Sequence, residues 1–267
     1  MEAQDLYKVL AEESPAKPAA QLNVELELAA MDVRQLDAND QRDWLAQWNS
    51  IFATIPAQAR VDLALKHFPG THMLSSSFGA QAAVSLHMLS AAKADIPVVL
   101  LDTGYLFPET YQFVGELTER MNLNLHTYRS LLTPAEQESR FGQRWLQGVE
   151  GIDAYNHENK VEPMQRALAE LEVGTWFTGI RRSQSSTRVD TEFVSLKDGR
   201  VKVAPIADWN DRDVFNYLKR YELPYHPLWH EGYVSIGDVH TTRSLHEVEN
   251  AEDVRFFGLK RECGLHS

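Results

Sequence analysis

A loop of small, hydroxyl-bearing residues stands out in the first half of the chain. It follows a short strand expected at 72–74 and precedes a helix expected from Ala80, and it contains Ser75, Ser76, Ser77 and Gly79. Backbone N–H groups at a helix start, together with hydroxyl donors and the helix dipole, favour an anion such as phosphate or sulfate. The loop is not a Walker A loop, because no Gly-Lys-Ser/Thr follows it. A serine-rich helix cap without a ligand is the alternative.

Two further polar loops are expected at the ends of strands. The continuous apolar run 96–101 is typical of a strand buried on both faces of a parallel sheet, and a second strand is expected at 175–180. Open α/β sheets bind ligands at the carboxyl ends of their strands, so the three loops together predict one anion site. Arginine suits phosphate there, although a solvated basic loop would look the same. The residues at these two strand ends are Asp102, Thr103, Gly104, Gly179, Arg181 and Arg182.

The elements that must position these loops alternate along the chain. Strand-then-helix units repeat three times, which favours an α/β fold with a doubly wound, mostly parallel sheet and helices on both faces. The segment 136–171 is expected to be mostly helical, with a break between helices at 160–164. The other elements are expected as helices at 39–50 and 56–68 and from Pro108, Thr133 and Asn210, a strand around 123–127, a hairpin turn at 198–199 and a strand at 201–206.

Composition limits the classes of protein that fit. The chain has 267 residues with 43% apolar composition, enough for a buried core, and its formal charge of −12 argues against nonspecific nucleic-acid binding. No apolar run has the length of a membrane span, and the N-terminus lacks the pattern of a signal peptide. We therefore expect a cytoplasmic enzyme without membrane or nucleic-acid partners.

The single cysteine, Cys263, lies near the end of the chain. One cysteine cannot form an intrachain disulfide, and no cysteine-rich metal or iron–sulfur site can be built from it, so we expect no metal. A lone cysteine is usually a buried small hydrophobe, but one on a basic tail beside a glycine is a better candidate for chemistry. We divide the chain into an N-terminal arm with a peripheral helix (1–38), an α/β nucleotide-binding catalytic domain (39–250) and a mobile C-terminal catalytic tail (251–267).

Seven stretches of the chain resemble the thioredoxin-dependent phosphoadenosine phosphosulfate (PAPS) reductases of sulfate assimilation, in the cluster-free branch of the sulfonucleotide reductases. The terminal Glu-Cys-Gly-Leu-His is specific to this family, whereas the serine loop alone belongs to a broader group of adenine-nucleotide enzymes. The resemblance implies an adenine nucleotide alpha hydrolase-like fold, and it covers the chain from about residue 40 to the end. The matching stretches are 75–81, 102–109, 160–163, 179–188, 225–237, 241–243 and 261–266.

The resemblance also implies a reaction. PAPS would be reduced to sulfite and adenosine 3′,5′-bisphosphate, with reduced thioredoxin or glutaredoxin as co-substrate, no bound cofactor and a homodimeric assembly. Cys263 would attack the sulfur and form a cysteine S-sulfonate, with His266 beside it. Cations would lower the repulsion between thiolate and anion and stabilise charge on the leaving phosphate. The cations expected in this role are Lys160, Arg243, Arg255 and Lys260.

The family divides over an iron–sulfur cluster. Relatives that carry a [4Fe–4S] cluster, most of which act on adenosine phosphosulfate (APS), have a Cys-Cys pair before the lysine and a Cys-x-x-Cys before the arginine. By this resemblance, the corresponding places in this chain are Tyr155-Asn156 and Asp238 with Thr241. Without thiolates a cluster cannot be ligated, so the resemblance implies a cluster-free enzyme. The absence of a cluster does not by itself decide the substrate, and a cluster-free APS reductase is the alternative.

Two other classes of protein fit part of the pattern. A synthetase or adenylyltransferase with the same serine loop would cleave ATP with Mg²⁺ and have no use for Cys263. A noncatalytic nucleotide sensor would bind PAPS without forming sulfite. The terminal cysteine motif argues against both.

Overall fold

The computed structural model of the protein describes residues 32–259. Most of the N-terminal arm lies outside this range, as do Lys260, Cys263 and His266. The roles expected for those residues stay predictions.

A six-stranded sheet forms the centre of the molecule, in the order β3-β2-β1-β4-β6-β5. Every neighbouring pair is parallel except β5 with β6, which form the expected hairpin. The chain runs outward from β1 through β2 to β3 and then returns to β4 on the other side of β1, so the strand order reverses between β1 and β4. Ligands bind at such a switch point in open α/β sheets. The strands are β1 (Thr71–Ser75), β2 (Pro97–Leu101), β3 (Asn124–Tyr128), β4 (Val173–Thr178), β5 (Val194–Lys197) and β6 (Arg200–Val203).

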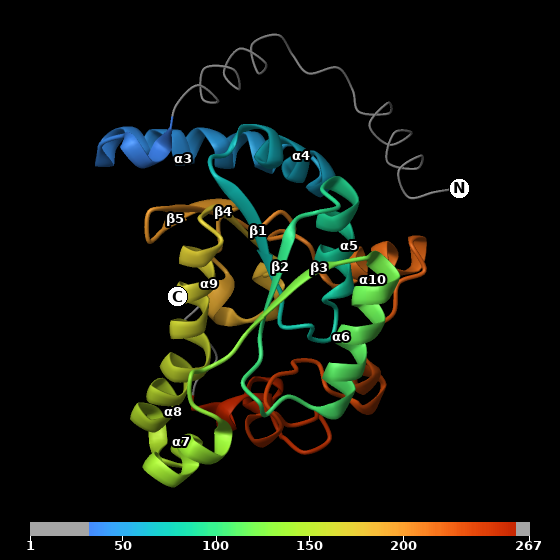
Figure 1. Ribbon diagram of the computed structural model, residues 1–267. Coiled ribbons are helices and arrows are strands. Elements are labelled where there is room, and N and C mark those ends of the chain that lie inside the picture. The colour runs from blue at the N-terminus through green and yellow to red at the C-terminus, as the bar shows by residue number, and fades with distance from the viewer. Residues whose placement is uncertain (1–31, 260–267) are drawn as a thin grey trace.

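Helices cover both faces of the sheet (Figure 1), which confirms the predicted fold class. Side chains alternate between the faces: Leu74 belongs to the larger core, and its neighbour Met73 packs against Met164 and Leu168 in the smaller one. Helices on the larger core are α3 (Ala38–Ala53), α4 (Ala57–His67), α5 (Ala83–Ala92), α6 (Pro108–Met121) and α10 (Asp211–Arg220). Those beside the smaller core are α7 (Pro134–Phe141), α8 (Gly148–Asn156) and α9 (Glu162–Glu170).

Three helices begin at other residues than predicted, and the smallest differences are of one residue, as for α4, which begins at Ala57 with Pro56 as its cap. The helix after the serine loop begins at Ala83, since residues 80–82 form turns in which the Ala82 N–H donates to the Gly79 carbonyl. Helix α3 begins at Ala38 with Asp37 as its cap, whose carboxylate accepts hydrogen bonds from the first turn. The predicted caps Thr133 and Asn210 are confirmed.

The predicted break between helices at 160–164 is wrong. A π-helical segment, His157–Val161, connects α8 to α9 without interruption. Pro163 directly follows this segment, in which the Glu162 N–H donates to the His157 carbonyl in the wider π pattern, and the helix continues past the missing N–H of the proline. Lys160 therefore projects from a continuous helix with one widened turn, a feature frequent at functional sites. No helix in the described part of the chain is long and apolar enough to cross a membrane.

Candidate active site

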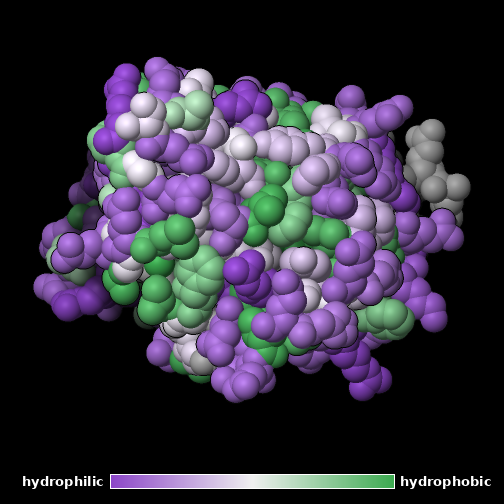
Figure 2. Space-filling model, turned by 90° about the horizontal axis from the view of Figure 1, so that it is seen from below, coloured by the Kyte–Doolittle hydropathy of each residue, from purple (hydrophilic) through white to green (hydrophobic). Residues whose placement is uncertain are grey.

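A cavity of about 580 Å³ opens at the carboxyl ends of the strands, beneath the switch point between β1 and β4. Figure 2 views the molecule from this end, where apolar side chains are exposed among polar ones near the middle of the face. Segments that are far apart in the sequence meet there, among them the serine loop, the end of β2 and the chain after it, the end of β4, the helical segment around Lys160 and the chain between 229 and 256. The residues predicted from sequence that line it are Ser75, Ser76, Ser77, Gly79, Lys160, Gly179, Arg181 and Arg255.

The serine loop is held by one hydrogen bond to the neighbouring strand β2 and by another within the loop. The Ser76 N–H donates to the Val99 carbonyl at 3.0 Å, and the Ser76 hydroxyl accepts from the Phe78 N–H at 3.1 Å. Phe78 has a φ of 49°, unusual for a residue with a side chain, and its ring is completely buried. The buried ring fixes the loop in this conformation, and the exposed Ser77 lines the cavity beside it.

The cavity cations differ in how firmly the protein holds them. Arg181 is buried and donates to the Gln81 side chain, the Ser183 hydroxyl and the Trp209 carbonyl, and it lies 3.0 Å from an Asp211 carboxylate oxygen. This network fixes the guanidinium at the end of β4 whether or not an anion is bound.

Lys160 and Asp238 form a buried ion pair in the cavity wall, with 3.1 Å between Nζ and Oδ2. The other carboxylate oxygen of Asp238 accepts a hydrogen bond from the Thr103 hydroxyl at 2.5 Å. Burial by itself would raise the pKa of Asp238, but the Lys160 charge, the Thr103 hydroxyl and the Arg255 charge lower it to about 2. The carboxylate is therefore ionised at neutral pH.

Two residues that the sequence analysis placed in the binding site lie outside the cavity lining, in the loop after β2. Asp102 is buried, and its carboxylate accepts hydrogen bonds from the Gly104 N–H (2.9 Å), the Tyr111 hydroxyl (2.7 Å) and Arg129 (2.8 Å). Gly104 has a φ of 77°, and a Cβ there would lie 2.6 Å from the Pro134 ring. Both residues shape the loop that carries Thr103.

Two arginines of the predicted set also lie outside the lining. Arg182 donates through Nε to the Thr191 carbonyl at 2.8 Å, and its guanidinium carbon lies 4.8 Å from the Phe193 ring centre. The guanidinium carbon of Arg243 lies 5.5 Å from the ring centre of Phe257. Contact of either arginine with a substrate stays a prediction.

Thr103 and Asp238 line the cavity but were not singled out as site residues, although Thr103 lay within the predicted strand-end segment 102–104. Thr103 could have been found from strand periodicity, because Val99, Leu101 and Thr103 alternate along β2 and its extension and all line the cavity. Asp238 lies far along the chain in a loop without regular periodicity. Only its place in the family motif singled it out, as a position where cluster-bearing relatives have cysteine.

Tyr155, another place compared with a cluster cysteine, belongs to a group of packed rings. The rings of Trp145 and His240 lie 3.7 Å apart, and Tyr155 and Tyr105 pack edge-on against His240. Burial lowers the pKa of His240 to about 4, so its imidazole is neutral at pH 7. Within residues 32–259, no group of three or more His, Cys, Asp or Glu side chains is placed to hold a metal ion.

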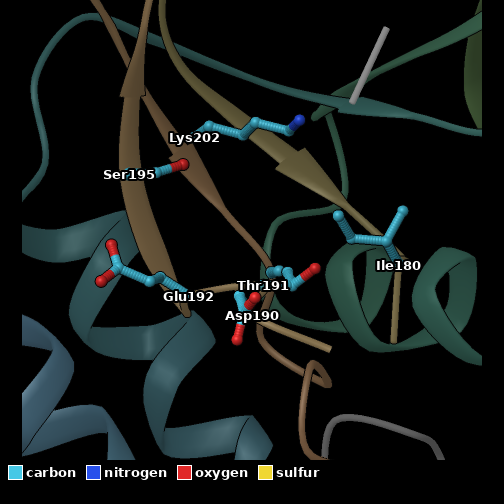
Figure 3. Close-up of a pocket in the computed structure, with 7 residues that line it drawn as sticks. Ile180, Asp190, Thr191, Glu192, Ser195 and Lys202 are labelled. Atoms are coloured by element: carbon cyan, nitrogen blue, oxygen red, sulfur yellow. The ribbon is translucent and has the colours of Figure 1, made fainter. Parts of the chain in front are cut away.

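A smaller hollow of about 290 Å³ lies beside β5 and β6. Its labelled side chains do not converge: in Figure 3 the Lys202 amine points away from the carboxylates of Asp190 and Glu192. The Lys202 Nζ instead lies 5.0 Å from the centre of the Trp176 ring. The larger cavity, with its converging hydroxyls and cations, is therefore the candidate active site.

Known proteins of one family share much of this sequence. The sequence profile of the phosphoadenosine phosphosulfate reductase domain matches residues 71–244. The chain is 58% identical over 226 residues to the phosphoadenosine 5′-phosphosulfate reductase of Shewanella oneidensis, covering 85% of this chain and 92% of the relative. It is 61% identical over 214 residues to the enzyme of that name from Alkalilimnicola ehrlichii, covering 80% and 87%.

Solved structures show the same fold. The phosphoadenylyl-sulfate reductase of Candida auris, crystallised as a phosphate complex, matches with a TM-score of 0.66 and 28% identity over 75% of this chain and 97% of that one. The FMN adenylyltransferase of Candida glabrata matches with a TM-score of 0.52 and 13% identity over 94% and 75%, a likeness of fold alone. The chain therefore belongs to the phosphoadenosine phosphosulfate reductase family.

Proposed function

We propose that this enzyme reduces PAPS to sulfite and adenosine 3′,5′-bisphosphate, with reduced thioredoxin as the electron donor. One observation carries the proposal: hydroxyls and cations from separate segments line a single cavity at the switch point of the sheet. PAPS is an adenine nucleotide with phosphate and sulfate groups, and such a cavity suits it. The names of the relatives support this substrate.

The reaction proceeds in two transfers. The Cys263 thiolate attacks the sulfate sulfur of PAPS, so that an S–S bond forms while the bond from sulfur to the bridging oxygen breaks. The leaving group is adenosine 3′,5′-bisphosphate, and the enzyme keeps a cysteine S-sulfonate. A thiolate of the donor then attacks the Cys263 sulfur and releases sulfite, and the donor's second thiol resolves the mixed disulfide. The donor supplies two electrons and leaves as a disulfide, and Cys263 is a thiol again.

The chain's own residues have separate parts in this scheme. Ser77 and the backbone around Gly79 bind a phosphate group, and Arg181 contributes a fixed positive charge. Lys160 and Arg255 offset the negative charge that the thiolate must approach, joined by Arg243 and Lys260 from the chain's last segments. His266 lies beside the nucleophile in sequence and would assist it. No bound redox cofactor takes part.

We also propose the setting of the reaction. The protein acts as a homodimer in the cytoplasm, in assimilatory sulfate reduction, with thioredoxin or glutaredoxin as its protein partner. These statements rest on the family resemblance. APS is the alternative substrate, because it lacks only the 3′-phosphate.

A sulfite-release assay tests the proposal. Purified enzyme is mixed with PAPS or with APS at equal concentration, in the presence of reduced thioredoxin, and sulfite is measured over time. We expect sulfite from PAPS at a much higher rate than from APS. Faster release from APS identifies an APS reductase instead. Pyrophosphate release from ATP with Mg²⁺, measured in parallel, detects the adenylyltransferase alternative.

A further inference from the structure

The ion pair between Lys160 and Asp238 is buried in the cavity wall. Asp238 is 1% exposed, and the Lys160 side chain is 11% exposed. Removing two charges from water costs about as much as their attraction returns, so stability alone does not account for such a pair. Its place in the wall of the anion cavity suggests a role in handling the substrate.

Asp238 connects three segments that are distant in sequence. Thr103 follows β2, Lys160 lies in the π-helical segment, and Asp238 lies in the loop that precedes a short 3₁₀ turn at Val239–Thr241. This loop is itself fixed beside β2, because the Val239 N–H donates to the Tyr105 carbonyl at 2.9 Å. Thr103 and Lys160 bind different oxygens of the carboxylate, so the position of each constrains the other.

The position of the Lys160 ammonium depends on Asp238, whereas the position of the Arg181 guanidinium does not depend on any single partner. Arg181 keeps its bonds to Gln81, Ser183 and Trp209 if Asp211 is removed. Within residues 32–259, the Lys160 ammonium has one hydrogen-bond acceptor, the Asp238 carboxylate. An ammonium has three N–H donors, so the bond to Asp238 leaves others for an anion in the cavity.

Aromatic rings restrict the ammonium further. Nζ lies 5.1 Å from the ring centre of Phe256 and 5.6 Å from that of Tyr155. A cation among aromatic faces and a single carboxylate has a preferred position, whereas a lysine side chain without such neighbours samples many rotamers.

We propose that Asp238 is a positioning residue, which holds the Lys160 ammonium toward the leaving phosphate through a carboxylate that Thr103 orients. This inference rests on the proposed function, because it requires an anionic substrate in the cavity. In this role Asp238 acts through Lys160 and does not need to contact the substrate. It lowers the number of positions open to Lys160, so that the positive charge is in place when negative charge develops.

A double-mutant cycle tests the inference. Asp238→Asn, Lys160→Gln and the double variant are compared with wild type for sulfite formation from PAPS under single-turnover conditions and for affinity for adenosine 3′,5′-bisphosphate. With Lys160 in place, Asp238→Asn should lower the rate of sulfite formation about 10- to 100-fold. This is the effect expected from the loss of a hydrogen bond to a charged group. The loss should fall on the maximal single-turnover rate more than on the affinity for the bisphosphate. In the Lys160→Gln background the same substitution should change the rate by less than about twofold.

Asp208→Asn is the matched control. Asp208 is the carboxylate partner of the buried Arg60, with 2.6 Å between Oδ1 and Nη1, and neither residue lines the cavity. Asp208→Asn should lower the melting temperature. If it changes the rate of sulfite formation, the factor should be the same in the wild-type and in the Lys160→Gln background. Melting curves of all variants verify that they fold.

Three results overturn the inference. They are an unchanged rate for Asp238→Asn, an equal loss in both backgrounds, and a loss confined to the melting temperature. If wild type releases sulfite, any of these results contradicts the role of Asp238 but leaves the proposed function in place. If wild type neither releases sulfite nor binds the bisphosphate, the proposed function fails and this inference fails with it.

Discussion

The indole nitrogen of Trp176 donates a hydrogen bond to the Ser75 hydroxyl, with 2.7 Å between the two atoms. Strand β4 thereby orients Ser75, the last residue of β1 and the first of the three serines, directly across the switch point of the sheet. The Ser76 hydroxyl accepts from the Phe78 N–H, so it too shapes the loop. Ser77 is exposed to the cavity, and among the described residues its hydroxyl has no hydrogen-bond partner. The three serines thus divide into two that build the loop and one that is available to a ligand.

Ser77→Ala should therefore weaken ligand binding without destabilising the fold. We expect the free energy of binding to adenosine 3′,5′-bisphosphate, measured by calorimetry, to become less favourable by about 1.5 to 3 kcal/mol, because a hydrogen bond to a charged phosphate is lost. Ser90→Ala, the same change on α5 outside the cavity lining, is the control and should leave the affinity at the wild-type value. Equal affinities for all three proteins would remove Ser77 from the site.

The backbone conformation of Gly104 leads to a prediction about the stability of the fold. Its φ is 77°, and a Cβ would lie 2.6 Å from Cγ of Pro134, so alanine there meets both backbone strain and a clash with α7. Gly104→Ala should lower the free energy of unfolding by about 2 to 4 kcal/mol. Chemical denaturation measures the change. A variant as stable as wild type would mean that the loop after β2 relaxes freely.

The control for this prediction is Gly115→Ala in α6. Gly115 has an ordinary helical backbone, and a Cβ there would have nothing within 4 Å. Alanine favours a helix over glycine by about 1 kcal/mol, so this variant should be slightly more stable than wild type.

The burial of His226 leads to a prediction about how the stability of the protein depends on pH. The ring is fully buried, Nδ1 accepts from the Leu228 N–H at 3.2 Å, and Nε2 lies 3.0 Å from the Thr110 hydroxyl. Burial lowers the pKa of His226 from its ordinary 6.5 to about 4. Between these values the unfolded chain binds more protons than the folded protein does. The stabilisation is thus complete above pH 6.5 and is lost as the pH falls toward 4, by at most about 1.4 kcal/mol per pH unit for one histidine.

Unfolding curves recorded between pH 7 and 4 measure this slope. His226→Asn removes the titrating ring but keeps a side-chain oxygen that can accept from the Leu228 N–H, so its stability should depend less steeply on pH. The pKa values of His87 and His240 are also lowered to about 4, both through burial, so part of the slope should remain. His230→Asn, a change at an exposed position, should keep the wild-type slope. An unchanged slope in His226→Asn would contradict the assignment.

Local sequence patterns were sufficient to predict most of the fold. Apolar runs and helix caps identified the strands and most helices, because period and capping chemistry act over a few residues. The same patterns placed the serine loop and Arg181 at strand ends, where the cavity lies. They failed at 160–164, because a proline that follows a π-helical turn inside a continuous helix looks the same in sequence as a proline that ends one.

The site itself was less predictable, for reasons of side-chain direction and long-range contact. Asp102 and Thr103 are neighbours, and successive side chains along an extended chain point to opposite sides, so only Thr103 lines the cavity. Residue type favoured the carboxylate, and periodicity favoured the hydroxyl. Asp238 meets Lys160 only after the whole sheet has formed, and no local pattern contains that information.

Cys263 is the centre of the proposed mechanism, and a change in its mass tests it most directly. Wild-type enzyme is mixed with PAPS in the absence of any dithiol, digested, and analysed by mass spectrometry. We predict one added sulfonate group on the peptide that contains Cys263, and its loss with release of sulfite when reduced thioredoxin is added. Cys263→Ser should bind the nucleotide but gain no mass and form no sulfite. Sulfite formation by Cys263→Ser, or by wild type without a sulfonated peptide, would contradict the covalent mechanism.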